Sequence, residues 1–78
     1  MGIFDNLRRR RELDKLESTA KENPSPINLC AFAERLMAYE DSSRALDVAK
    51  KAMESYPENE RVVSTYRYIT KLLHQARI

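Results

Sequence analysis

Few side chains in this sequence of 78 residues could perform chemistry, and they are scattered. His74 is the only histidine, and it has no cysteine or carboxylate at the spacing of metal ligands. Cys30 is the only cysteine, and no histidine near it in the sequence could activate its thiol. Glu12, Asp14 and Glu17 form an acidic group, which a solvated helix face explains. A glycine-rich phosphate loop needs more than the single glycine present. We therefore expect no enzymatic activity, no metal and no cofactor.

Binding is the chemistry that remains, and it depends on the helices that would present the side chains. Between residues 29 and 57, two segments of helical period flank Glu40-Asp41-Ser42-Ser43, whose short polar side chains interrupt helices. The apolar stripes are Leu29, Phe32, Ala33 and Leu36 in the first segment, and Ala45, Ala49, Ala52, Met53 and Tyr56 in the second. Alanines dominate the second stripe, so the two helix axes can approach closely. This stretch predicts a helical hairpin.

The hairpin resembles a tetratricopeptide repeat, in which large and small residues alternate between two packed helices. The places of the repeat pattern are filled here by Leu29, the pair Phe32-Ala33, Leu36, Ala45, Ala49, Ala52 and Pro57. Two of them depart from the family, because Ala49 replaces a bulky residue and Leu29 stands where tryptophan is common. The resemblance implies a protein-binding helical module. The alternative is an unrelated helical hairpin, whose packing would also require small residues.

Proline junctions bound this hairpin. In Asn23-Pro24-Ser25-Pro26, each proline disfavours helical geometry in the residue before it, so a first helix from Met1 must end by about Glu22. We expect Ser25 to cap the next helix, with Pro26 in its first turn. A similar junction follows Tyr56, and its Pro57 lies 33 residues after Pro24, close to the 34-residue repeat period.

A further helix is expected from about Glu58 to Ala76. Its apolar stripe is Val62, Tyr66, Ile69, Leu73 and Ala76, with Leu72 beside it. It resembles the terminal capping helix of a repeat array, because Arg67 stands where a continuing repeat would have a small residue. The whole chain thus predicts an all-α fold, a small antiparallel bundle or solenoid of about four helices. Its parts are an amphipathic helix over 1–22, the hairpin over 23–57 and the capping helix over 58–78.

Composition restricts the remaining possibilities. A chain of this length forms one domain, or a fragment of one, and buries only about 60% of its unfolded surface. The net charge of +2 is too small to predict a nucleic-acid partner. A single cysteine favours a reducing compartment, and no apolar run matches a signal peptide or a membrane span. We expect a cytoplasmic protein, with a peripheral membrane location as a further option.

The tetratricopeptide resemblance implies which residues bind a partner. The concave face of such an array would present Ile27, Cys30, Glu34 and Met37 from the first hairpin helix, and Arg61, Ser64, Tyr68 and Lys71 from the last helix. This groove would hold a helix or an extended peptide of a protein partner. In the alternative, the first helix covers Ile27 and Met37 through Leu13 and Leu16, and no open groove exists.

The first helix carries a second candidate surface. Its apolar residues form two patches, Ile3, Phe4 and Leu7 in one and Leu13, Leu16 and Ala20 in the other, and Arg8, Arg9, Arg10 and Arg11 lie between them. Consecutive arginines must point all the way round a helix. In one interpretation the first patch and the arginines contact an anionic membrane surface. In the other, Leu13, Leu16 and Ala20 pack on the hairpin, and residues 1 to 10 are a frayed, solvated end.

Three function classes follow from the sequence. The leading hypothesis is a non-enzymatic adaptor that docks a protein segment through Ile27, Met37 and Tyr68. The second is a scaffold unit that self-assembles through uncovered solenoid ends into a homodimer or a longer array. The third is membrane recruitment through the arginine segment.

Overall fold

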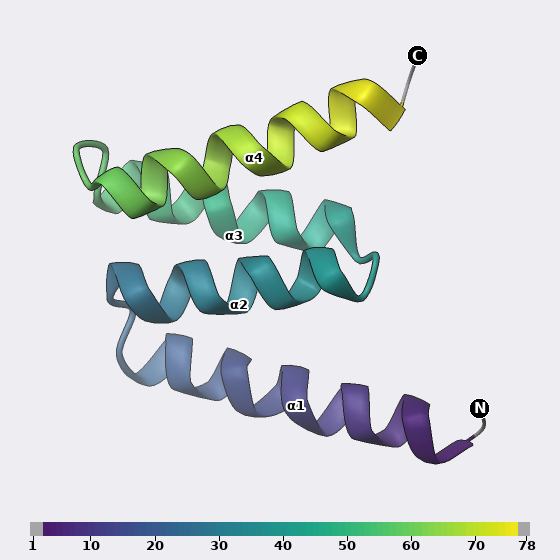
Figure 1. Ribbon diagram of the computed structural model, residues 1–78. Coiled ribbons are helices and arrows are strands. Elements are labelled where there is room, and N and C mark those ends of the chain that lie inside the picture. Colours follow the sequence, from purple (N-terminus) through teal and green to yellow (C-terminus); the bar gives the residue numbers. More distant parts are fainter. Residues whose placement is uncertain (1–2, 77–78) are drawn as a thin grey trace.

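The computed structural model describes the backbone of residues 3–76 and the side chains of residues 7–75. The described backbone forms four helices and no strand, so the predicted all-α fold is confirmed (Figure 1). The helices are α1 (Ile3–Glu22), α2 (Pro26–Ala38), α3 (Ser42–Ser55) and α4 (Glu60–Ala76).

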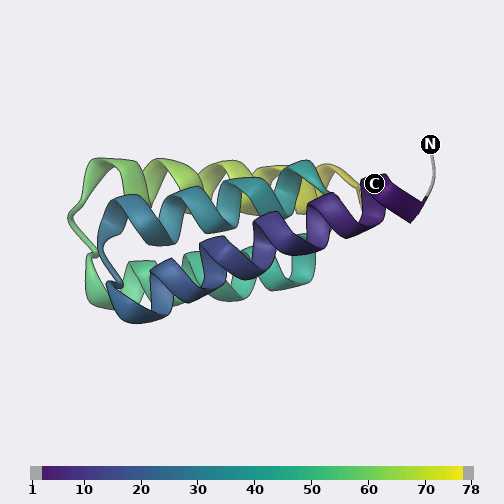
Figure 2. The ribbon, with the colours of Figure 1, turned by 90° about the horizontal axis from the view of Figure 1, so that it is seen from below.

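The helices form a thin slab of about 40 × 37 × 14 Å. Each helix packs on the one before it in the sequence, and α2 also packs directly on α4. Figure 2 shows that α2 and α4 run in the same direction in one layer, while α3 and the C-terminal half of α1 lie in a second layer. Helix α2 therefore contacts all three other helices and lies at the centre of the fold.

The start of α2 follows the predicted capping. Ser25 is the N-cap residue, its side chain accepts a hydrogen bond from the Asn28 backbone N–H at 3.2 Å, and Pro26 occupies the first turn. This bond satisfies one of the backbone donors that every helix start leaves free. Similarly, the Asn59 side chain accepts from the Val62 N–H at 3.1 Å, so α4 begins at Glu60 and not at the predicted Glu58.

The turn between α2 and α3 is shorter than the predicted four polar residues. The chain reverses at Glu40, which has a φ of 64°, a left-handed conformation that is uncommon for a residue with a β-carbon. Asp41 is the N-cap residue of α3, so Ser42 and Ser43 belong to the helix. The backbone reversal therefore takes place within residues 39–41.

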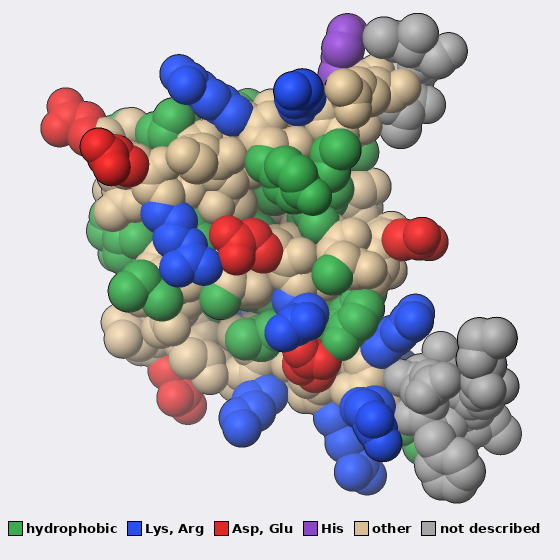
Figure 3. Space-filling view, viewed as in Figure 1, with side chains coloured by type: hydrophobic (Ala, Val, Ile, Leu, Met, Phe, Trp, Pro, Cys, Tyr) green, Lys and Arg blue, Asp and Glu red, His purple; other side chains and the backbone are tan. Residues whose placement is uncertain are grey.

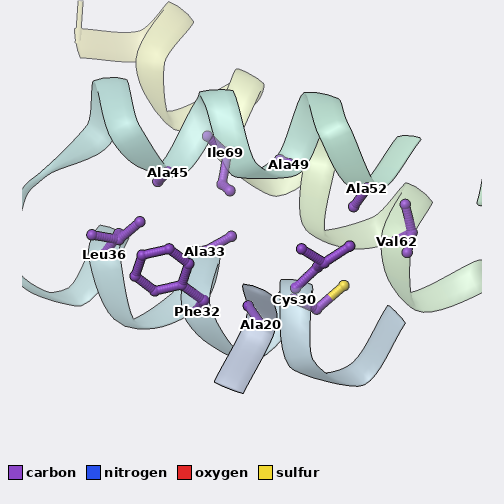
Figure 4. Packing of buried hydrophobic residues seen from close by; sticks show 11 residues of the cluster. Ala20, Cys30, Phe32, Ala33, Leu36, Ala45, Ala49, Ala52, Val62 and Ile69 are labelled. Carbon is purple, nitrogen blue, oxygen red and sulfur yellow. The ribbon is translucent and has the colours of Figure 1, made fainter. Parts of the chain in front are cut away.

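The core contains the predicted stripes of the hairpin. The buried hydrophobic residues are Ala20, Leu29, Cys30, Phe32, Ala33, Leu36, Ala45, Ala49, Ala52, Val62 and Ile69 (Figure 4). Half-buried side chains at its edge include Leu13, Leu16, Met53, Tyr56, Tyr66 and Leu73. The predicted packing of Leu13, Leu16 and Ala20 onto the hairpin is thus confirmed. Large residues of α2 face alanines of α3, which lets these two helices pack closely.

Candidate functional site

Five of the predicted contact residues lie on a shared surface, which we call the α2/α4 face: Ile27 and Glu34 of α2, and Arg61, Ser64 and Tyr68 of α4. A hollow of about 280 Å³ in this face is lined by Glu34 of α2 and by Arg61, Ser64, Thr65 and Tyr68 of α4. Four of these five residues belong to the predicted binding set. Figure 3 shows basic and acidic side chains meeting on this side of the molecule, with hydrophobic patches on both sides of them.

Glu34 connects the two helices across the hollow. Its Oε1 lies 3.0 Å from Nη2 of Arg61, and its Oε2 accepts a hydrogen bond from the Thr65 hydroxyl at 3.2 Å. The two charged side chains are 48% and 44% exposed, so the ion pair contributes at most about 1 kcal/mol to stability. The same contacts place both charged groups together at the surface.

Two exposed hydrophobic side chains flank this ion pair. Ile27 is 65% exposed and lies two turns before Glu34 on the same side of α2. Tyr68 is 55% exposed and lies two turns after Arg61 on the same side of α4. Since α2 and α4 run in the same direction, Ile27 and Tyr68 lie toward opposite ends of the face. The face therefore has a charged centre and an apolar contact at each end.

A second hollow, of about 350 Å³, adjoins the first between α1 and α2. Its lining residues are Glu12, Leu16, Ala31, Glu34, Arg35 and Ala38. Ala31 and Arg35 were missing from the predicted binding set, although they follow Ile27 at helical spacings of four and eight residues. That spacing was the sequence signal that could have identified Ala31 and Arg35 as surface residues. Including them extends the candidate surface toward α1.

Polar contacts hold the rim of this second hollow together. Glu12 Oε1 lies 2.6 Å from Nε of Arg35, and its Oε2 accepts a hydrogen bond from the Tyr39 hydroxyl. The guanidinium of Arg9 lies 5.2 Å from the centre of the Tyr39 ring. The hydrogen bond to Glu12, followed by partial desolvation and the negative charge of Glu12, raises the pKa of Tyr39 above its ordinary value.

The acidic group of α1 is therefore more than a solvated face, which corrects the sequence interpretation. Glu12 joins α1 to α2, and Glu17 forms an ion pair with Arg44 of α3 at 3.2 Å. Asp14 alone of the three is exposed, whereas Glu12 and Glu17 are half-buried. Sequence spacing could not show this, because the partners lie 23 to 27 residues away on other helices.

Two of the predicted contact residues do not lie freely on the face. Cys30 is 1% exposed and belongs to the core (Figure 4), so its assignment to the groove was wrong. Because α2 packs against three helices, its buried surface is wider than the single stripe that the pattern indicated. Met37 is half-buried and packs against the core. Lys71 is exposed but lines neither hollow.

The alternative in which the first helix covers the groove is wrong for Ile27, whose side chain is largely exposed. Leu16 does reach α2, but it lines the second hollow without covering Ile27. Both hollows open to the surface.

The arginine segment is exposed at each of its residues, from Arg8 to Arg11, and Leu7 before it is 43% exposed. Ile3 and Phe4 of the same predicted surface lie outside the described side chains. None of the described helices combines the length and apolar content needed to cross a bilayer. Among the described residues, no three His, Cys, Asp or Glu side chains gather as a metal site would require.

No family model, curated protein or solved structure matches this chain.

Proposed function

We propose that this chain is a non-enzymatic, tetratricopeptide-like adaptor that docks a segment of a partner protein on its α2/α4 face. The observation that carries the proposal is the position of Ile27 and Tyr68, exposed at opposite ends of a face whose centre is the Glu34–Arg61 ion pair. Exposed hydrophobic side chains beside charged and polar groups are typical of protein-binding surfaces.

Two features support the repeat-like part of the proposal. The α2–α3 hairpin packs large side chains of one helix against alanines of the other, as the repeat pattern requires. Helix α4 lies beside α2 and runs in the same direction, as the first helix of a following repeat would. In this arrangement α2 and α4 would form the inner layer that receives the partner.

The face defines the chemistry of its partner. A matching segment carries two apolar side chains, one for Ile27 and one for Tyr68, with a polar or charged group between them that can hydrogen-bond to Glu34 or Arg61. An amphipathic helix or an extended peptide meets these requirements. The two apolar contacts supply most of the affinity, since exposed ion pairs contribute little.

The test is to select peptides from a random display library on the immobilised chain, and to titrate the best one by calorimetry. Ile27→Glu should weaken binding at least tenfold, because it removes one of the two apolar contacts that supply most of the affinity. Leu7→Glu is the matched control, because it makes the same change at an exposed hydrophobic residue outside the α2/α4 face. Enrichment of no peptide, or equal affinity of both variants, would contradict the proposal.

Met37→Glu would be a poorer test than Ile27→Glu, because Met37 packs against the core. A buried charge there would destabilise the fold. Ile27→Glu avoids this problem, since its side chain already faces water, and unchanged helicity by circular dichroism would verify it.

A second candidate is self-assembly through the outer edge of α3 and α4. A hollow of about 250 Å³ lies there, lined by Leu46, Thr70, Leu73 and His74. Leu46 and Leu73 are half-buried, so a second copy could cover them further. Light scattering over a range of concentrations tests this candidate, and a monomer mass that does not change with concentration would exclude it.

A further inference from the structure

Helix α1 carries apolar residues on two opposite sides. Leu16 packs against the core and lines the hollow beside α2, so its side of α1 faces the bundle. Leu7 lies nine residues earlier, which is about two and a half helical turns. Leu7 therefore points away from the bundle, in agreement with its exposed fraction of 43%.

The four arginines divide between these two sides. With about 100° of rotation per residue, Arg8, Arg10 and Arg11 all lie within about 100° of Leu7. Arg9 is turned about 160° from Leu7, toward the bundle, and its guanidinium lies over the Tyr39 ring. Three arginines thus surround Leu7 on the outer side of α1, and the fourth is held by the fold.

This outer side is accessible and positively charged. Figure 2 shows that the N-terminal turns of α1 extend past the ends of the other helices. In the sequence, Asp5 is the one acidic residue before Glu12, and Glu12 is already engaged by Arg35 and Tyr39. Farther along the same side, Asp14 and Lys15 are both exposed and offset each other in charge.

We propose that Leu7, Arg8, Arg10 and Arg11 of α1 dock the protein on an anionic phospholipid bilayer. The apolar side chain enters the boundary between headgroups and acyl chains, and the arginines contact the lipid phosphates. A polyanion such as nucleic acid would be held by charge alone and would have no use for Leu7.

Docking through this surface leaves the α2/α4 face free. Leu7 points away from the bundle, whereas Ile27 and Tyr68 lie on the layer that α2 and α4 form. The two surfaces are therefore separate, and a membrane-bound molecule could still bind its partner.

The test is co-sedimentation of the full chain with vesicles of phosphatidylcholine alone, and of phosphatidylcholine mixed equally with phosphatidylserine. We expect binding to the mixed vesicles only. Arg8→Gln, Arg10→Gln and Arg11→Gln should each lower the partition coefficient about fivefold, the usual effect of one basic residue near such a surface. Arg9→Gln should change it much less, because Arg9 faces Tyr39. Leu7→Glu should abolish binding, and Ile27→Glu should leave it unchanged.

Several results would overturn the proposal. Equal losses for Arg9→Gln and Arg10→Gln would show that position around the helix does not matter. Equal binding to both kinds of vesicle would show that the protein does not select anionic lipid. Binding to neither kind would show that this surface does not dock on a bilayer. Tight binding of an oligonucleotide by both the wild type and Leu7→Glu would reassign the arginines to nucleic acid. A Leu7-dependent dimer without vesicles would reassign the surface to a second copy. Circular dichroism of every variant verifies that the helices are intact.

Discussion

The hydroxyl of Tyr56 donates a hydrogen bond to the backbone carbonyl of Pro24 at 2.7 Å. Tyr56 ends the hairpin and Pro24 precedes it, so this single bond joins two junctions that are 32 residues apart in the sequence. It closes the hairpin at the end where α1 leads into α2 and α3 leads into α4.

Removing the Tyr56 hydroxyl tests how much this hydrogen bond contributes to the free energy of unfolding. Tyr56→Phe should lower the free energy of unfolding by about 1 kcal/mol, the usual net contribution of a protein hydrogen bond. The measurement is urea unfolding followed by circular dichroism. Tyr68→Phe is the matched control, because Tyr68 is exposed on the α2/α4 face. Equal effects of the two substitutions would show that the Tyr56 bond contributes nothing specific.

The alanine stripe of α3 sets the distance between α2 and α3. Ala49 is 2% exposed in the core, so Ala49→Leu should overpack this contact and destabilise the fold by about 1–3 kcal/mol. Ala38→Leu makes the same change at an exposed position of α2 and should have little effect. Thermal unfolding of both variants checks the difference. A stable Ala49→Leu variant would contradict close packing of the hairpin.

Tyr39 makes stability depend on pH in the alkaline range. Its hydrogen bond to Glu12 favours the neutral phenol and raises the folded-state pKa above the ordinary value of 10.0. The folded state therefore holds the proton more tightly than the unfolded state. This stabilisation is fully present below the ordinary pKa and is lost as the pH rises through the folded-state pKa.

Tyr39→Phe checks this dependence. The difference in urea midpoint between wild type and variant should be constant at neutral pH and should shrink above pH 10. Tyrosinate absorbance should show one late-titrating tyrosine in the wild type that the variant lacks. A difference in midpoint that stays constant across the alkaline range would argue against the Glu12 bond.

The sequence predicted the helices well, because local signals determine them. The proline junctions, the Ser25 cap and the stripe from Leu29 to Leu36 all act within a few residues, and the structure contains each of them. The turn at Glu40 was less predictable, since a left-handed glutamate has no distinctive local signal. The observed start of α3 at Ser42 therefore differs from the predicted interruption at residues 40–43, although the hairpin itself was predicted.

The candidate site was predicted only in part, because it depends on how many neighbours each helix has. A single stripe pattern placed Cys30 at the surface, whereas contacts of α2 with three helices bury it. The pairing of Glu34 with Arg61 joins residues 27 positions apart, which periodicity cannot indicate. The sequence showed two separate apolar patches on α1. Which patch faces the bundle and which faces solvent became clear from the packing of Leu16 on the core and of Arg9 over Tyr39.

The most direct test of the adaptor proposal is to map the bound peptide on the chain by nuclear magnetic resonance. The selected peptide would be titrated into isotope-labelled protein while the backbone amide shifts are followed. We expect the largest shifts around Ile27, Glu34, Arg61 and Tyr68, with Leu7 to Arg11 unaffected. Shifts centred on the outer side of α1, or on Leu46 and Leu73 at the outer edge of α3 and α4, would contradict a binding site on the α2/α4 face.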